Sequence, residues 1–311
     1  RFIFALGADG DPRKVQWCDR EDNTIWTPDA TNEAGDYILQ TPGFIQTAFR
    51  VRGQTLIITD QDAHAATYIG APFVYGFQRV GNACGVISKK SGAVAEGNAF
   101  WMGANNFYMY DGSMVKELPS EVDDYVFRNI NNDQKSKVAA VSNSKFNEIW
   151  WFYPSGDSLE NNKYVIYNYR ENTWYIGNLG RSTGVDAGVY RNPIFFCVSN
   201  YRPHQHELGF DYHSADMPYA ETGAMSLGAG DNVMHVTKLI PDELTQGDVT
   251  ATFKTRFHPN DTERTYGSYT MSNPTSIRFT GRQVKMRIDG AEATSWRIGT
   301  MRLDVSPGGR R

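Results

Sequence analysis

Short runs of alternating apolar and polar residues, separated by tight polar turns, follow one another along most of this chain. The segment 163–177, KYVIYNYRENTWYIG, holds two aromatic-rich runs on either side of the polar residues REN. Two such runs joined by a short turn are typical of a β-hairpin, because aromatic and β-branched residues favour strands. Only the segment 121–133, EVDDYVFRNINND, has fair helical character, and it predicts one short helix. The pattern as a whole predicts an all-β fold.

The run pattern repeats at a nearly constant distance. The segments 99–118 and 148–177 each contain a run around Trp, a loop, a Tyr-rich run and a final short strand, and the segments 55–70 and 193–213 are weaker copies. A further apolar run near Ile3 lies 53 residues before the centre of the next run. Four successive run centres are separated by 45, 49 and 45 residues, and they are Leu56, Trp101, Trp150 and Phe195.

Such a period is typical of a β-propeller, whose blades contain about 40–50 residues and four strands each. An array of βαβ units would need helices between the strands, and a sandwich alone would show strands every ~8–12 residues without the longer period. We therefore predict that residues 1–222 form four or five propeller blades. Because the chain begins with Arg1 inside the strand-like run RFIFALG, we expect the propeller to be incomplete at its N-terminus.

The predicted blades also account for the many aromatic residues, which make up 13% of the chain. Blades pack face to face and bury side chains on both faces. We therefore interpret the aromatic residues around the hairpin as packing between blades rather than as a platform for carbohydrate stacking. The residues covered by this interpretation are Trp150, Trp151, Tyr164, Tyr167 and Trp174.

Residues 223–311 follow a different pattern, with clean alternation over longer strands. Val249 and Phe253 lie on one predicted face, and the phase of the alternation flips across Gly281 and again across Gly299, as a bulge or bend would cause. We predict a β-sandwich domain here, with one basic outer face. The residues predicted on that face are Lys254, Arg256, Arg278, Lys285, Arg287, Arg297 and Arg302.

Charge is divided unevenly along the chain. The net charge is −4, but residues 1–231 contain 19 basic and 27 acidic residues, whereas residues 232–311 contain 12 and 8. The overall negative charge argues against a general nucleic-acid binder. The basic face has two interpretations, a solvated surface that limits aggregation and a contact with an acidic neighbour.

The motifs of familiar catalytic and cofactor sites are absent from the sequence. We find no P-loop, GxGxxG, GxSxG, HExxH or sialidase box, and we predict no catalytic, cofactor or metal site and no enzyme activity. His204, His206, Glu207 and His213 could suggest a metal site, but we expect solvated loop histidines instead. The three cysteines are far apart in the sequence, which indicates folding in a reducing compartment.

Several strings of the sequence carry a resemblance when they are taken together. The repeat region contains WMGANNFYMYDG, ELPSEVDDYVFRNIN, KFNEIWWFYPS and YVIYNYRENTWYIG, and the C-terminal region contains FTGRQVKMRIDG and SWRIGTMRLDVSPGGRR. In combination these strings resemble the tail hub, or nozzle, proteins of short-tailed bacteriophages, which are also called packaged-DNA stabilisation proteins. The similarity covers nearly the whole chain, from VQWCDREDNTIW onward.

The resemblance implies a structural role without catalysis or a cofactor. Proteins of this family combine a propeller with β-sandwich parts, form a hexameric ring below the portal and its adaptor, and carry tail fibres or spikes. Packaged DNA runs down the axis of the ring, which implies passage without sequence-specific binding, and no membrane insertion by the chain. The implied location is the virion, in the phage tail, after assembly in the host cytoplasm.

The charge distribution agrees with a ring, because an acidic body and a basic terminal domain suit contacts between neighbouring subunits. We therefore expect the seven basic residues to contact a neighbouring subunit or the adaptor. The alternative function is a glycan-binding or glycan-cleaving β-propeller. A kelch-like adaptor is a weaker alternative, since the Gly-Gly doublets of kelch blades are missing.

Overall fold

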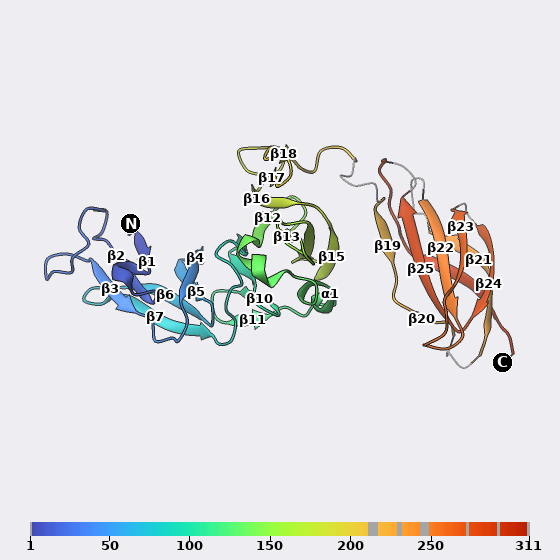
Figure 1. Ribbon diagram of the computed structural model, residues 1–311, viewed down its shortest axis with the longest axis horizontal. Coiled ribbons are helices and arrows are strands. Elements are labelled where there is room, and N and C mark those ends of the chain that lie inside the picture. The colour runs from blue at the N-terminus through green and yellow to red at the C-terminus, as the bar shows by residue number, and fades with distance from the viewer. Residues whose placement is uncertain are drawn as a thin grey trace. The chain divides into compact units, whose positions relative to one another are not determined.

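The computed structural model describes residues 2–210, 217–228, 232–242, 249–271, 274–290 and 293–309. The chain divides into two compact units, Arg1–Glu207 and Leu208–Arg311, and nearly all regular structure in both is β (Figure 1). The predicted short helix is confirmed as α1, Asp123–Phe127. Two 3₁₀ turns accompany it in the first unit, η1 (Ala8–Gly10) and η2 (Asn132–Lys137). Among the described residues, no helix is long and apolar enough to cross a membrane.

The first unit contains five antiparallel sheets, and the strands of each sheet are paired in chain order (Figure 1). The first sheet consists of β1 (Phe4–Leu6), β2 (Lys14–Trp17) and β3 (Gly35–Ile38). The second consists of β4 (Ile45–Val51), β5 (Gln54–Thr59), β6 (Ala63–Gly70) and β7 (Val74–Gly81). The third consists of β8 (Gly92–Ala95), β9 (Asn98–Met102), β10 (Phe107–Tyr110) and β11 (Val115–Glu117). The fourth consists of β12 (Ala139–Asn143), β13 (Glu148–Tyr153), β14 (Lys163–Asn168) and β15 (Thr173–Asn178), and the fifth of β16 (Arg181–Val185), β17 (Ile194–Cys197) and β18 (Pro203–Gln205).

The sheets adjoin one another through their first strands, since β4 contacts β8, β8 contacts β12, and β12 contacts β16. A series of antiparallel meanders joined in this way is the arrangement of propeller blades. The all-β, propeller-like fold predicted for this region is therefore confirmed. The hairpin predicted at 163–177 is also confirmed, as strands β14 and β15 of the fourth sheet.

The repeat period is confirmed by the second strands of the sheets. Leu56, Trp101, Trp150 and Phe195 lie on β5, β9, β13 and β17, the second strand of each successive sheet. The extension of the period to Ile3 is wrong, because the second strand of the first sheet is β2 and Ile3 precedes β1. That sheet has only three strands, with a long connection between the second and the third.

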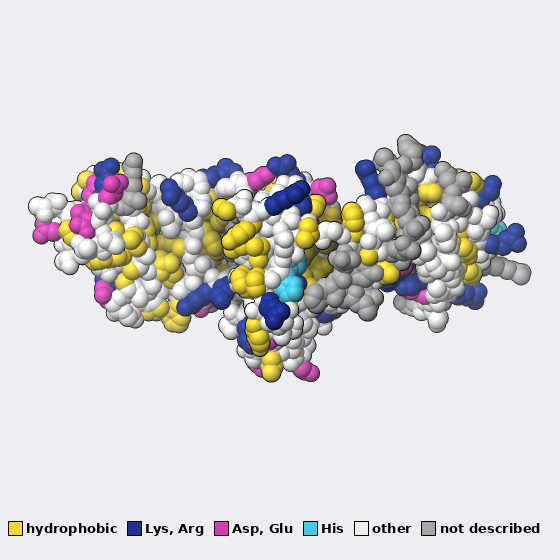
Figure 2. Space-filling view, turned by 90° about the horizontal axis from the view of Figure 1, so that it is seen from above, with side chains coloured by type: hydrophobic (Ala, Val, Ile, Leu, Met, Phe, Trp, Pro, Cys, Tyr) yellow, Lys and Arg dark blue, Asp and Glu magenta, His cyan; other side chains and the backbone are white. Residues whose placement is uncertain are grey.

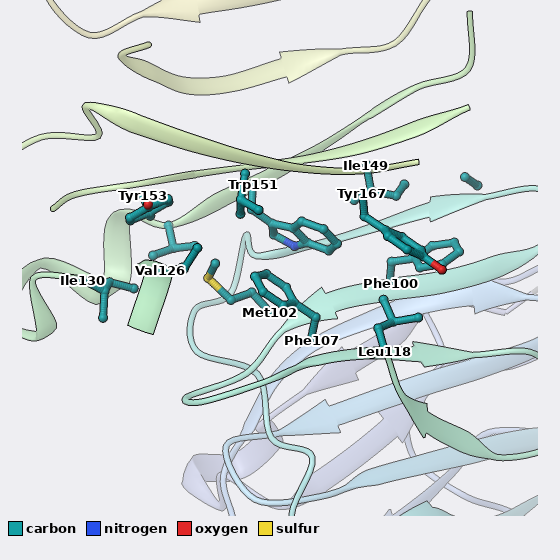
Figure 3. Close-up of a cluster of buried hydrophobic side chains, with 13 residues drawn as sticks. Phe100, Met102, Phe107, Leu118, Val126, Ile130, Ile149, Trp151, Tyr153 and Tyr167 are labelled. Atoms are coloured by element: carbon teal, nitrogen blue, oxygen red, sulfur yellow. The ribbon is translucent and has the colours of Figure 1, made fainter. Parts of the chain in front are cut away.

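Aromatic residues fill the spaces between neighbouring sheets. Trp151 is fully buried against Phe107 of the third sheet, with ring centroids 4.9 Å apart, and its Nε1 donates to the Ser91 carbonyl at 3.0 Å (Figure 3). Its neighbour Trp150 points to the other side of the same strand and packs on Phe195 of the fifth sheet, with centroids 5.6 Å apart. The interpretation of these aromatic residues as packing between blades is confirmed. Tyr164, Tyr167 and Trp174 belong to or pack against the same two clusters.

The second unit consists of two antiparallel sheets that share one apolar cluster. One sheet has the order β19 (Tyr219–Glu221), β25 (Gln283–Gly290), β22 (Val249–Arg256) and β23 (Arg264–Thr270), with β20 (Met225–Ser226) also paired to β25. The other has the order β24 (Thr275–Gly281), β21 (Met234–Pro241) and β26 (Met301–Pro307). The shared cluster supports the expected β-sandwich, which stays a prediction. Residues of the cluster include Val236, Leu239, Phe253, Phe279 and Ile288.

Two expectations for this region need correction. The phase flip at Gly281 is not a bulge within one strand, because β24 and β25 belong to different sheets and the chain crosses between them at this point. The boundary expected at residue 222 also differs from the observed division after Glu207. The strand β19 lies before residue 222 but pairs with β25 of the second unit, which places these residues in that unit.

Candidate functional site

The seven predicted basic residues do not lie on one face. Lys254, Arg256, Lys285 and Arg287 lie on β22 and β25 of the larger sheet, where alternate residues of β22 point into the shared cluster. Arg278 and Arg302 lie on β24 and β26 of the smaller sheet, and Arg297 lies in the segment before β26. The seven residues are thus divided between two different sheets and the segment before β26. The expectation of a single basic face is therefore wrong.

Three of the four basic residues of the larger sheet are paired with acids, and Arg256 instead donates to Gln283 Oε1. Lys254 Nζ lies 3.1 Å from a Glu221 carboxylate oxygen, and Lys285 Nζ lies 2.6 Å from one of Glu263. Arg287 lies 2.7 Å from a carboxylate oxygen of Asp289, beside the ring of Tyr219. The larger sheet therefore carries acids beside most of its basic residues. Figure 2 shows Lys and Arg side chains spread over the visible surface of the second unit, not gathered into one patch.

Two carboxylates meet at one amide in the first unit. Asn143, the last residue of β12, is fully buried, and its Nδ2 donates to Glu148 Oε2 and to Glu207 Oε1, each at 3.2 Å. Glu148 begins β13 directly opposite Asn143 in the strand register. Glu207 is the last residue of the first unit and follows β18. The β12–β13 hairpin of the fourth sheet thereby contacts the residue that follows the last strand, β18, of the fifth sheet.

Burial and mutual repulsion both act on these carboxyls. Burial raises the pKa of Glu148, and the nearby charge of Glu207 raises it further, although Trp150 Nε1 donates to Glu148 Oε2 at 2.8 Å. Burial also raises the pKa of Glu207, while the hydrogen bond from Asn143 and the charge of Lys145 act against this rise. Lys145 Nζ donates to the backbone carbonyl of Glu207 at 3.2 Å. Burial of both groups and their like charges make it unfavourable for the two carboxyls to be ionised together.

Sequence reasoning did not bring these carboxylates together. They are 59 residues apart in the chain, and they meet only because successive sheets stack. The one available signal was an acidic residue at the start of the otherwise apolar run EIWWFY, and that pattern is common at strand ends.

The candidate histidines are not all solvated loop residues. His204 lies on β18 beside Asn200, and His206 packs on the Phe195 ring with centroids 4.3 Å apart. His213 lies outside the described residues. Within the described ranges, no group of three or more His, Cys, Asp or Glu side chains could hold a metal ion.

Comparisons with known proteins leave the family open. No family model and no curated protein matches the chain. The WD40 domain of Pan2 from Neurospora crassa matches at 12% identity over 52% of this chain and 50% of that chain, with a TM-score of 0.32. An exo-β-1,3-galactanase from Phanerochaete chrysosporium with galactose matches at 10% identity over 98% and 92%, with a TM-score of 0.34. Both scores lie below 0.5, so neither likeness carries an argument about function.

Proposed function

We propose that this chain is a structural component of a bacteriophage tail, a tail hub or nozzle subunit that forms a homo-oligomeric ring. One observation carries the proposal. The strings that resemble the tail hub family form the packed framework of the third and fourth sheets, from β9 and β10 through α1 to β13, β14 and β15. The resemblance therefore falls on residues that determine how the sheets stack.

The proposed partners follow from that role. They are other copies of the chain in a hexameric ring, a portal adaptor, tail fibres or spikes, and packaged DNA that passes without sequence-specific binding. The proposed location is the virion. The exposed arginines of the smaller sheet in the second unit, Arg278 and Arg302, are candidates for the contact with a neighbouring subunit or the adaptor.

Negative-stain microscopy and size-exclusion chromatography of the purified protein test the proposal. We expect closed rings, whose proportion increases with protein concentration because subunit association obeys mass action. A protein that stays monomeric at high concentration and binds oligosaccharides on a glycan array would contradict it.

The carboxylate pair supports a second candidate function, glycan hydrolysis. Glu148 Oε2 and Glu207 Oε1 bond the same nitrogen, each at 3.2 Å, so they lie at most 6.4 Å apart. Retaining glycosidases hold two carboxyl groups at about 5–5.5 Å, one as acid and one as nucleophile. If the pair is catalytic, Glu148→Gln abolishes release of sugar from cell-surface glycans while the protein stays folded. Equal sugar release by the wild type and Glu148→Gln would exclude catalysis by this pair. The absence of sugar release by either protein would exclude it as well.

A further inference from the structure

The sheets of the first unit repeat one kind of contact. On the second strand of the second, third and fourth sheets, two alternate side chains point toward the sheet that follows. Each of these side chains is at most 9% exposed, because it packs in a cluster that the following sheet shares. The six residues are Leu56, Ile58, Phe100, Met102, Trp150 and Phe152.

The corresponding face of the fifth sheet is open. On β17, Phe195 points back toward the fourth sheet, so Ile194 and Phe196 point to the other side. Phe196 is 38% exposed, and Val185, which lies opposite Ile194 in the register, is 48% exposed. Pro203, opposite Phe196, is exposed as well. Within the described part of the first unit no sheet follows the fifth, and we call the surface formed by these four outward residues the open face.

The charges around the open face are mainly positive. Residues 181–205 contain three basic residues and one acidic residue. Arg191 and Arg202, which precede and follow β17, are exposed, and neither has an ion pair among the described residues. The open face therefore suits a partner that offers apolar side chains with acidic residues around them.

The first sheet presents its outer face at the other end of the series. Val15 points into the cluster shared with the second sheet, so Lys14 and the residue opposite it, Ile38, point away from that sheet. Ile38 is 42% exposed. Lys14 Nζ lies 2.6 Å from a carboxylate oxygen of Asp9 and 3.0 Å from one of Asp36. Carboxylates therefore outnumber the ammonium group on this face.

The two ends of the series are complementary in charge. Residues 2–38 contain eight acidic and three basic residues, in contrast to the basic excess in 181–205. In Figure 1 the first sheet (β1–β3) and the fifth sheet (β16–β18) lie apart within the first unit. The acidic outer face of one end therefore does not cover the open face of the other end within a single chain.

We infer that the open face of the fifth sheet binds the outer face of the first sheet of a second copy of this chain. The inference rests on the proposed homo-oligomer and names one of its contacts. Stacking of sheets, which runs through the first unit, thereby continues from one copy to the next. Two different surfaces meet, so each copy keeps one surface for another neighbour, and such a contact forms a ring when the rotation closes.

Sedimentation velocity of the purified full-length chain and two blocked variants tests the inference. Phe196→Asp blocks the open face, and Ile38→Asp blocks the first sheet. We expect each variant alone to associate at least about tenfold more weakly than the wild type, because its new charge is buried in an apolar contact. An equimolar mixture should form dimers and stop there, since it retains one intact pair of surfaces.

Leu159→Asp is the matched control, because it adds the same charge at a 67% exposed apolar position of the fourth sheet's loop. It should associate as the wild type does. Circular dichroism checks the folding of each variant, and Val185→Asp replaces Phe196→Asp if that variant does not fold.

Three outcomes overturn the inference. Wild-type rings from Phe196→Asp would do so while leaving the proposed function in place, whereas a wild-type chain that stays monomeric would contradict both. If Phe196→Asp lowers the melting temperature without weakening association, another part of the same chain covers the open face. If Ile38→Asp alone still forms dimers and the mixture forms no additional ones, two open faces pair with each other.

Discussion

At the scale of single residues, the two adjacent tryptophans of β13 contribute to different packing layers. Trp151 contacts the third sheet and Trp150 contacts the fifth, because successive side chains of a strand point to opposite faces. One dipeptide thus joins three sheets. This packing explains why the chain concentrates aromatic residues here.

Replacing Trp151 with alanine should cost about 3–5 kcal/mol of unfolding free energy, since the change leaves a cavity among fully buried neighbours. Urea denaturation followed by circular dichroism measures the effect. The matched control is Tyr175→Ala in the next hairpin, where the side chain is 46% exposed and the cost should be small. Equal effects of the two changes would contradict the assignment of Trp151 to the core.

The Glu148–Glu207 pair should make stability depend on pH. Both pKa values are raised in the folded state, above the value near 4.3 expected for an unfolded chain. At pH values between the unfolded pKa and the raised folded pKa, the folded state therefore binds more protons than the unfolded state. The unfolding free energy should fall as pH rises through this range. Glu207→Gln should flatten this fall, whereas the exposed control Glu121→Gln should leave it unchanged. Unfolding curves measured from pH 4 to 8 give the comparison, and identical slopes for all three proteins would exclude a coupled pair.

At the scale of elements, one kind of hairpin turn joins the first two strands of two successive sheets. Arg52 and Gly53, between β4 and β5, both have positive φ, and so do Glu96 and Gly97 between β8 and β9. Two consecutive residues with positive φ form the turn whose twist matches paired strands. The same kind of turn therefore begins two successive sheets and aligns their second strands at the observed period.

Close contacts between loops restrict other glycines. A Cβ on Gly85 would lie 2.1 Å from the backbone carbon and carbonyl oxygen of Asp60, which cannot move as a flexible side chain could. We expect Gly85→Ala to lower the unfolding free energy by about 1–3 kcal/mol or more. Gly188→Ala is the control, because nothing lies within 4 Å of its added carbon. Thermal unfolding of both variants tests this, and a wild-type melting temperature for Gly85→Ala would show that the loop moves freely.

At the scale of the whole molecule, the two sheets of the second unit differ in how their charges are used. The larger sheet pairs Lys254, Lys285 and Arg287 with Glu221, Glu263 and Asp289. On the smaller sheet, Arg278 and Arg302 are exposed and have no ion pair among the described residues. Lys238 on β21, between their strands, is exposed as well. Charges without an internal partner are the better candidates for contact with an acidic neighbour.

Reversing Arg278 and Arg302 to glutamate should weaken ring assembly, if the chain forms the proposed ring. The effect should be larger at low salt, because exposed charges are screened at high salt. Sedimentation velocity at two salt concentrations measures it. The control is the reversal of Lys89 and Lys135, two exposed lysines of the first unit, which changes the net charge equally. Equal loss of assembly in both double variants would indicate a general charge effect.

The sequence alone determined the features that depend on local pattern. The aromatic runs and their period near 47 residues predicted the blades and the packing role of Trp150 and Trp151, because strand side chains alternate whatever their partners are. Alternation in 249–256 also predicted which face of β22 is buried. The tertiary structure decided what depends on partners distant in the chain. It divided six of the seven basic residues between two sheets, since a strand's pattern does not reveal which sheet the strand joins. It also brought Glu148 and Glu207 to the same amide of Asn143, because that contact arises only when successive sheets stack.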